Sequence, residues 1–137
     1  MANTGQDWAA SWTTVDASIA LTTGGTTTDT SAAQSNDLKS ACEISIDVDY
    51  SNHALSGTGL LVYILRDING TDYESSADGA WSFEMPFTQN GTHRRSFAVP
   101  PDMTSSFKIG LDWQNATGSS VATVATSIRQ ADIPLAS

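Results

Sequence analysis

The chain has 137 residues, and its fifteen acidic side chains against six lysines and arginines give a formal net charge of −9 at pH 7. This charge repels phosphate backbones and anionic lipids, so nucleic acid and membrane surfaces are disfavoured as partners. No apolar run approaches the roughly 20 residues of a membrane-spanning helix, and the first residues do not read as a signal peptide, so we expect one soluble domain made in a cytoplasm.

The chain divides into an N-terminal arm at 1–14 and a single β-sandwich domain at 15–137. The arm is polar apart from two tryptophans, and a first strand follows at 16–21. The stretch 22–31 is too polar to bury and too rich in glycine and threonine for a helix, which predicts an exposed loop or a weak edge strand. Residues 31–39 have room for one helical turn, and no other segment favours a helix.

Two segments, 42–50 and 107–113, have an apolar side chain at every second position, which is typical of a half-buried antiparallel strand. Cys42 falls on the apolar side, so we expect a small core residue rather than a reactive thiol. Asp47 and Asp49 share the polar face, where they repel each other unless an arginine or a cation lies nearby. A solvated strand face is the favoured interpretation.

The segment 58–66 is apolar on both faces, with Leu61, Tyr63 and Leu65 opposite Leu60, Val62 and Ile64. In a two-layer sandwich the second face then needs a cover from a loop, from the arm or from another subunit. We expect a cover from within the chain.

Three dipeptides, Asn69-Gly70, Asp78-Gly79 and Asn90-Gly91, predict tight turns. Further strands are expected at 81–85, at 92–99 and from 121 to 127 or slightly beyond. The strand at 92–99 ends at two prolines and should point Phe97 and Val99 inward. Alternation also places Trp81 and Trp113 on the packed face.

About eight short strands separated by frequent turns predict an all-β fold, an antiparallel β-sandwich of which a jelly roll is one arrangement. The sequence lacks the nucleophile motif G-x-S-x-G, and its two histidines lie far apart along the chain. We therefore expect no catalytic residues, no cofactor and no enzymatic activity.

Asp67, Asn69 and Asp72 place three oxygen-bearing side chains within six residues, a pattern that can coordinate calcium. The spacing is not that of an EF-hand, which is longer and ends in glutamate. An Asn-Gly turn rimmed by solvated aspartates accounts for the same residues, so we expect no metal site there.

Five residues are candidates for binding a partner. His93, Arg94 and Arg95 form a basic cluster that can pair with an acidic patch on a neighbouring subunit, or can serve as ordinary charge that prevents edge aggregation. Trp8 and Trp12 lie in the polar arm, where they either anchor a neighbouring chain or fold back over the strand at 58–66.

The strand and turn cadence over most of the chain resembles that of small β-sandwich structural proteins of tailed bacteriophages, of the head decoration or tail accessory type. The segments that carry the resemblance are 12–15, 59–65, 67–73, 97–100 and 107–118. The resemblance implies a virion component, assembled in the host cytoplasm, that binds the major capsid protein or other virion proteins without chemistry.

A decoration or cement protein of this kind would be present in many copies and would form a homo-oligomer, with a trimer as one option. Similar cadences occur in carbohydrate-binding sandwiches. The alternative function is therefore a carbohydrate-binding module or a tail-associated host-recognition protein, in which an exposed aromatic residue such as Tyr73 stacks on a sugar.

Overall fold

The computed structural model describes residues 7–22, 26–36, 39–51, 59–75, 80–86, 91–99, 106–114 and 121–132. All regular secondary structure in these residues is β-strand, and no helical turn forms at 31–36. The strands are β1 (Asp7–Trp8), β2 (Thr13–Thr22), β3 (Thr28–Thr30), β4 (Gln34–Ser35), β5 (Lys39–Ser51), β6 (Gly59–Arg66), β7 (Trp81–Pro86), β8 (Gly91–Ala98), β9 (Ser106–Trp113) and β10 (Val121–Asp132).

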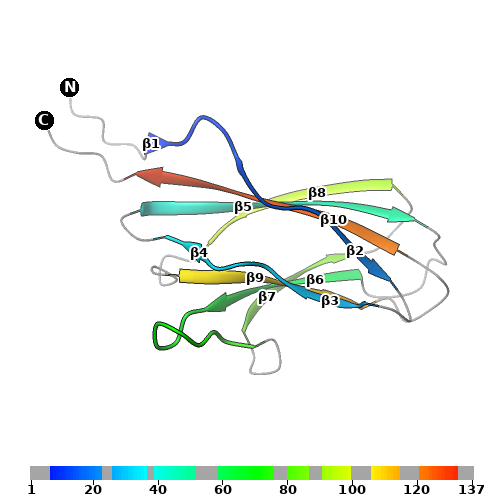
Figure 1. The fold of residues 1–137 in the computed structure, drawn as a ribbon. Helices are drawn as coiled ribbons and strands as arrows, with labels where there is room; N and C mark the ends of the chain where they lie inside the picture. Colours follow the sequence, from blue (N-terminus) through cyan, green and yellow to red (C-terminus); the bar gives the residue numbers. More distant parts are fainter. Residues whose placement is uncertain are drawn as a thin grey trace, which may run out of the picture.

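These strands form two antiparallel sheets of five strands each, stacked face to face (Figure 1). In the first sheet β10 pairs with β1 and β2 along one edge and with β5 along the other, and β8 follows β5. In the second sheet β9 pairs with β3 and β4 along one edge and with β6 along the other, and β7 follows β6. The predicted antiparallel β-sandwich is confirmed.

The strand order identifies the sandwich as a jelly roll. For comparison with a jelly roll, β1 and β2 are counted together as the first strand, and β3 and β4 together as the second, which leaves eight strands in chain order. The first sheet then has the order first, eighth, third, sixth. The second sheet has the order second, seventh, fourth, fifth. Each connection but the one within the β6–β7 pair crosses from one sheet to the other, which is how two Greek keys build the jelly-roll fold.

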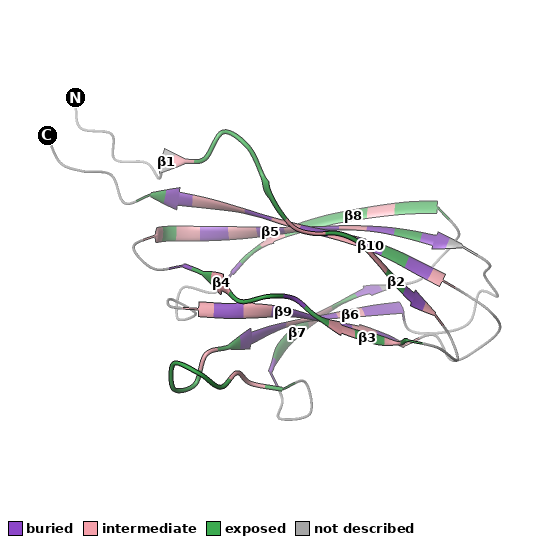
Figure 2. Ribbon diagram, viewed as in Figure 1, coloured by how far each residue is buried: buried purple, intermediate pink, exposed green. Residues whose placement is uncertain are grey.

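The core lies between the two sheets, where alternate side chains of β5, β6, β9 and β10 are buried together with Leu21 of β2 and Met85 of β7 (Figure 2). Cys42 is 1% exposed, as expected from its place in the alternation of β5. Tyr50 stacks on Trp113 at 5.4 Å between ring centroids, and its hydroxyl donates a hydrogen bond of 3.1 Å to the carbonyl of Met85. Because Tyr50 belongs to the first sheet and both partners to the second, these contacts tie the two layers together.

Most strand predictions hold, and the differences concern one side chain and the bounds of strands. β2 begins at Thr13, inside the stretch predicted as an arm. Trp81 was expected in the core but is 39% exposed, because β7 is the edge strand of the second sheet and its first residue lies at the open side of the sandwich. β10 extends to Asp132, five residues beyond 127. The expected turns at Asp78-Gly79 and at Asn90 lie outside the described residues, whereas Gly70 has the positive φ of +92° that its turn requires.

The expected cover over the outer face of β6 is partial and comes from the chain itself. Residues 67–75 fold back after β6: Asp67 bridges to Tyr73, and the backbone N–H of Glu74 donates to the carbonyl of Arg66. Leu65 is consequently buried, while Leu61 and Tyr63 remain half-buried. The arm does not take part, since β1 pairs with β10 in the other sheet.

Candidate functional site

The two arm tryptophans lie against Arg129 of their own chain. The guanidinium carbon of Arg129 is 5.1 Å from the ring centroid of Trp8 and 5.0 Å from that of Trp12. Its Nη2 donates a hydrogen bond of 2.8 Å to Oε2 of Glu43, while its buried Nε has no hydrogen-bond partner within the described part of the chain. We call these four residues the arm clamp.

The arm clamp lies on the outer face of the first sheet. Ile128 is buried in the core, so the next residue along β10, Arg129, points to the other side. The residues between β1 and β2 bulge away from β10 and bring Trp12 back over the guanidinium; Trp12 remains 38% exposed. The hypothesis that the tryptophans cover β6 is therefore wrong, and the binding of a neighbouring chain stays a prediction.

The basic cluster at 93–95 does not form one patch. It lies within β8, where successive side chains point to opposite faces. Nε of Arg94 is 2.7 Å from Oδ2 of Asp47, Arg95 lies 5.0 Å from the ring centroid of Phe83, and the His93 ring is half-buried. Arg94 thus supplies the counter-charge that Asp47 needs, and Arg95 serves a different surface.

That second surface is the open side of the sandwich between β7 and β8, which we call the aromatic edge. Phe83 meets Phe97 edge-on at 4.2 Å between ring centroids, and Trp81 lies 5.5 Å from Phe97. Arg95 covers the Phe83 ring, while Trp81 is exposed. Sequence alternation predicts these aromatic positions but cannot show that β7 and β8 are both edge strands.

The predicted calcium candidates form a hydrogen-bonded turn. Oδ1 of Asp67 accepts from the backbone N–H of Asn69 and of Gly70, at 3.0 and 2.5 Å. Oδ1 of Asn69 accepts from the N–H of Thr71 and of Asp72, and its amide nitrogen donates to Oδ2 of Asp72 at 2.7 Å. The described residues contain no cluster of metal-ligating side chains, and these oxygens are directed into the turn.

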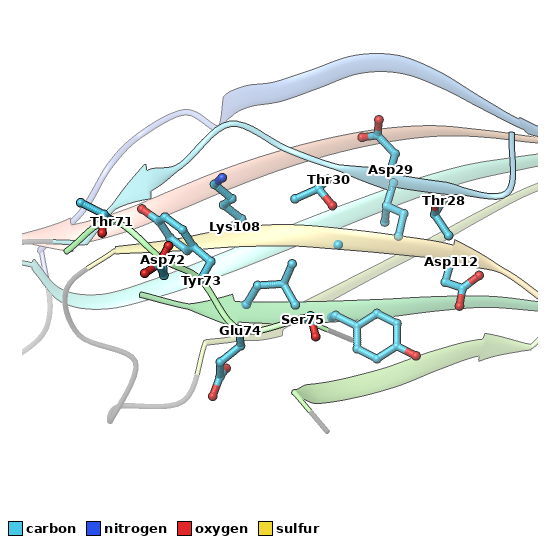
Figure 3. Close-up of a pocket in the computed structure, with 14 residues that line it drawn as sticks. Thr28, Asp29, Thr30, Thr71, Asp72, Tyr73, Glu74, Ser75, Lys108 and Asp112 are labelled. Atoms are coloured by element: carbon cyan, nitrogen blue, oxygen red, sulfur yellow. The ribbon is translucent and has the colours of Figure 1, made fainter. Parts of the chain in front are cut away.

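Residues 71–75 form one wall of a groove on the outer face of the second sheet, opposite β3 (Figure 3). Thr71, Asp72 and Tyr73 lie at one end in this view, and Thr28 and Asp112 at the other. The cavity volume is about 440 Å³. The groove is lined by Thr28, Asp29, Thr30, Tyr63, Leu65, Thr71, Asp72, Tyr73, Glu74, Ser75, Lys108, Gly110, Leu111 and Asp112.

Several polar groups at the groove are held by contacts within the chain. The Tyr73 hydroxyl is 2.7 Å from Oγ of Ser106, and Nζ of Lys108 lies 4.5 Å from the Tyr73 ring centroid. Glu74 binds the Arg66 guanidinium at 2.7 Å, and these hydrogen bonds lower the pKa of its carboxyl. Tyr73, named above as an example of a sugar-stacking residue for the alternative function, thus has a lysine against its ring.

Elsewhere, burial is the main cause of the pKa shifts. Burial raises the pKa of the Cys42 thiol to about 12, with a smaller contribution from the charge of Glu43. It also raises the pKa of Tyr50 to about 12. The pKa of Asp29 is raised by burial and by the nearby charge of Asp16.

Sequence reasoning missed Arg129 and the groove. A lone arginine near the end of a strand gives no signal of its own. The groove had one signal: Gly110 interrupts an otherwise apolar and charged strand, and an isolated glycine in a strand marks a site of close approach.

No protein-family model matches the chain, and neither does any curated protein. The chain is similar to a chain in a reconstruction of a human norovirus GI.7 Houston strain virus-like particle, with 7% identity and a TM-score of 0.47 over 93% of the present chain. A chain from infectious bursal disease virus, Gx strain, has 12% identity and a TM-score of 0.42 over 98%. The present chain spans 33% and 38% of those two chains, respectively.

Within the described ranges, no helix is long and apolar enough to cross a membrane.

Proposed function

We propose that the chain is a non-enzymatic structural protein of a tailed-phage virion, a capsid decoration or cement protein that binds the major capsid protein. The jelly-roll strand order supports this proposal, because this architecture recurs in viral capsid domains. It also recurs in lectins and cupins, and a fold does not by itself imply a function. The argument for a partner therefore rests on the surface.

The observation that carries the proposal is that an exposed tryptophan lies in a cluster of aromatic and arginine side chains at two places. Trp12 is 38% exposed beside Arg129, and Trp81 is 39% exposed at the aromatic edge, where Arg95 lies over the neighbouring Phe83 ring. Tryptophan, tyrosine and arginine are enriched among the residues that dominate the energy of protein interfaces. Each site thus offers a rigid aromatic anchor that a shell protein can cover.

The first experiment measures where the protein resides. Quantitative mass spectrometry of purified particles gives the copy number of this chain relative to the major capsid protein. A ratio near one, or a simple fraction of it, supports decoration across the lattice. A few copies per particle would move the protein to the tail or connector, and absence from particles would refute a virion role.

A second experiment tests the two surfaces. Binding of the purified protein to particles that lack it is measured for Trp12→Ala and Trp81→Ala. Loss of an interface anchor costs about 2 kcal/mol or more, which corresponds to a roughly 30-fold weaker affinity. Ile68→Ala is the matched control, because Ile68 is a large apolar side chain that is 65% exposed and belongs to neither the arm clamp nor the aromatic edge. Equal binding by all three variants would refute the anchor argument.

Self-association belongs to the same proposal, with a trimer as the expected form. Sedimentation equilibrium of the purified protein measures its mass directly. A monomer over the whole accessible concentration range would restrict oligomerisation to the particle surface.

A further inference from the structure

The groove on the second sheet has a flat floor made by three neighbouring strands. Tyr63 of β6 and Thr30 of β3 both lie opposite Gly110 of β9, so one row across the sheet reads threonine, glycine, tyrosine. In the adjacent row, Asp112 of β9 lies between Thr28 and Leu61. The hydroxyls of β3 and the Asp112 carboxylate therefore lie on the same face as the side chains of Leu61 and Tyr63.

The lack of a side chain at Gly110 leaves room in the floor of the groove. A Cβ at this position would lie 3.2 Å from Cδ1 of Leu65 and 3.4 Å from Cβ of Tyr63. The absence of that carbon lets these two side chains approach the β9 backbone from the neighbouring strand. Tyr63 is half-buried, so an apolar and aromatic surface remains accessible in the middle of the groove.

The rim of the groove is polar and is dominated by oxygen. Thr28 and Thr30 lie on one side, and Thr71, Asp72 and Ser75 lie on the other. The positive charge nearby, on Lys108, is placed over the Tyr73 ring, as described above. A hydroxyl can both donate and accept a hydrogen bond, whereas a carboxylate only accepts. Together they can bond to a row of ligand hydroxyls, each of which also donates and accepts.

We propose that this groove binds a neutral oligosaccharide. A sugar ring has one apolar face of C–H groups and a perimeter of hydroxyls, which correspond to the Tyr63 floor and to the threonine and carboxylate rim. The volume of about 440 Å³ falls within the range of roughly 300 to 1,000 Å³ of small-molecule sites. The proposal does not depend on a role in a virion.

The charge distribution decides against other ligand classes. Asp72 and Asp112 at the groove and the net charge of −9 disfavour phosphorylated, sulfated and carboxylated ligands. A lipophilic ligand would remove water from the carboxylates at the groove and supply no hydrogen bonds in its place, which is costly. A neutral polyhydroxyl ligand satisfies them with hydrogen bonds.

The test is a titration of the ¹⁵N-labelled protein, followed by amide chemical shifts, with maltohexaose, cellohexaose and hexa-N-acetylchitohexaose as separate probes. A sulfated heparin hexasaccharide is the charged counter-probe. We expect at least one neutral probe to shift the amides of Thr30, Tyr63 and Gly110 with a Kd below about 1 mM. The sulfated probe should leave these amides unchanged.

Variants then locate the site. Tyr63→Ala should weaken binding of the active probe at least tenfold, whereas Trp81→Ala, at the aromatic edge, should leave it within twofold. Asp112→Asn keeps the shape of the floor and removes one acceptor, so it should weaken binding severalfold and replaces Tyr63→Ala as the test if that variant does not fold.

Three results would overturn the proposal: no shift with any neutral probe at about 10 mM, shifts confined to residues outside the groove, or undiminished binding by the groove variant. Failure of this titration leaves the copy number on particles unaffected, so the two proposals fail separately.

Discussion

The arm clamp gives the sharpest quantitative prediction. The Arg129 side chain is 31% exposed and has both tryptophan rings within 5.1 Å. A cation–π contact contributes about 0.5–1 kcal/mol when exposed and about 2 kcal/mol when desolvated, so each half-exposed ring should contribute about 1 kcal/mol. The ion pair with Glu43, at 2.8 Å and similarly half-exposed, adds about 0.5 kcal/mol.

We therefore expect Arg129→Ala to lower the free energy of unfolding by about 2–3 kcal/mol. For a domain of this size, each kcal/mol corresponds to a fall in Tm of roughly 3–4 °C, so Tm should fall by roughly 6–12 °C. Arg129→Lys should recover part of the loss, since it keeps the charge but not the planar guanidinium.

A double-mutant cycle with Trp12→Ala isolates the contact from the general effect of truncation. Urea denaturation of the parent, both single variants and the double variant should give a coupling free energy of about 1 kcal/mol. The matched control pairs Trp12→Ala with Arg94→Ala, which removes an arginine bound to Asp47 on β5, and these two should be additive. A Trp12–Arg129 coupling below about 0.3 kcal/mol would refute the clamp.

Three further predictions concern burial and the turn at Gly70. Cys42, at 1% exposure and with a pKa of about 12, should resist labelling by a disulfide reagent at pH 8 until the protein is unfolded, and prompt native labelling would contradict its burial. The folded state raises the pKa of both Cys42 and Tyr50, so the free energy of unfolding should be constant below about pH 9 and should fall as pH rises towards 12. Urea midpoints measured from pH 7 to 11 check this dependence. Cys42→Ala should shift the onset of the fall to about pH 10. Gly70→Ala should cost about 1 kcal/mol because of its φ of +92°. Ile68→Ala, which truncates an exposed side chain of the same turn, is the control in the same denaturation series, and equal midpoints would contradict a strained turn.

The strands could be predicted because a sheet with one buried face leaves its burial pattern in the sequence at every second residue. β5 is the clearest case: Ile44, Ile46 and Val48 are fully buried, and the residues between them are not. Strand order leaves no such local record, since it is decided by which faces and edges meet across the whole chain. That is why Trp81 was placed in the core although its alternation was read correctly.

Adjacency in sequence was a poor guide to surfaces. Residues 93–95 form one basic cluster in the sequence, but successive side chains of a strand point to opposite faces of the sheet. Arg94 and Arg95 therefore contact different groups. Trp12 and Arg129 are distant in sequence, and β10 brings them together only because it pairs with both β1 and β2. The turn at Asn69-Gly70, by contrast, depends on local chemistry, so its position could be predicted from the dipeptide alone.

The geometry of the fold lets the two proposed interactions coexist. The arm clamp lies on the outer face of the first sheet, and the groove lies on the outer face of the second, with the core between them. A protein that binds a shell through Trp12 would therefore turn Tyr63 and the groove towards the medium. Such a particle would carry the groove in as many copies as the protein itself, so that a weak sugar affinity at each site would be multiplied by avidity.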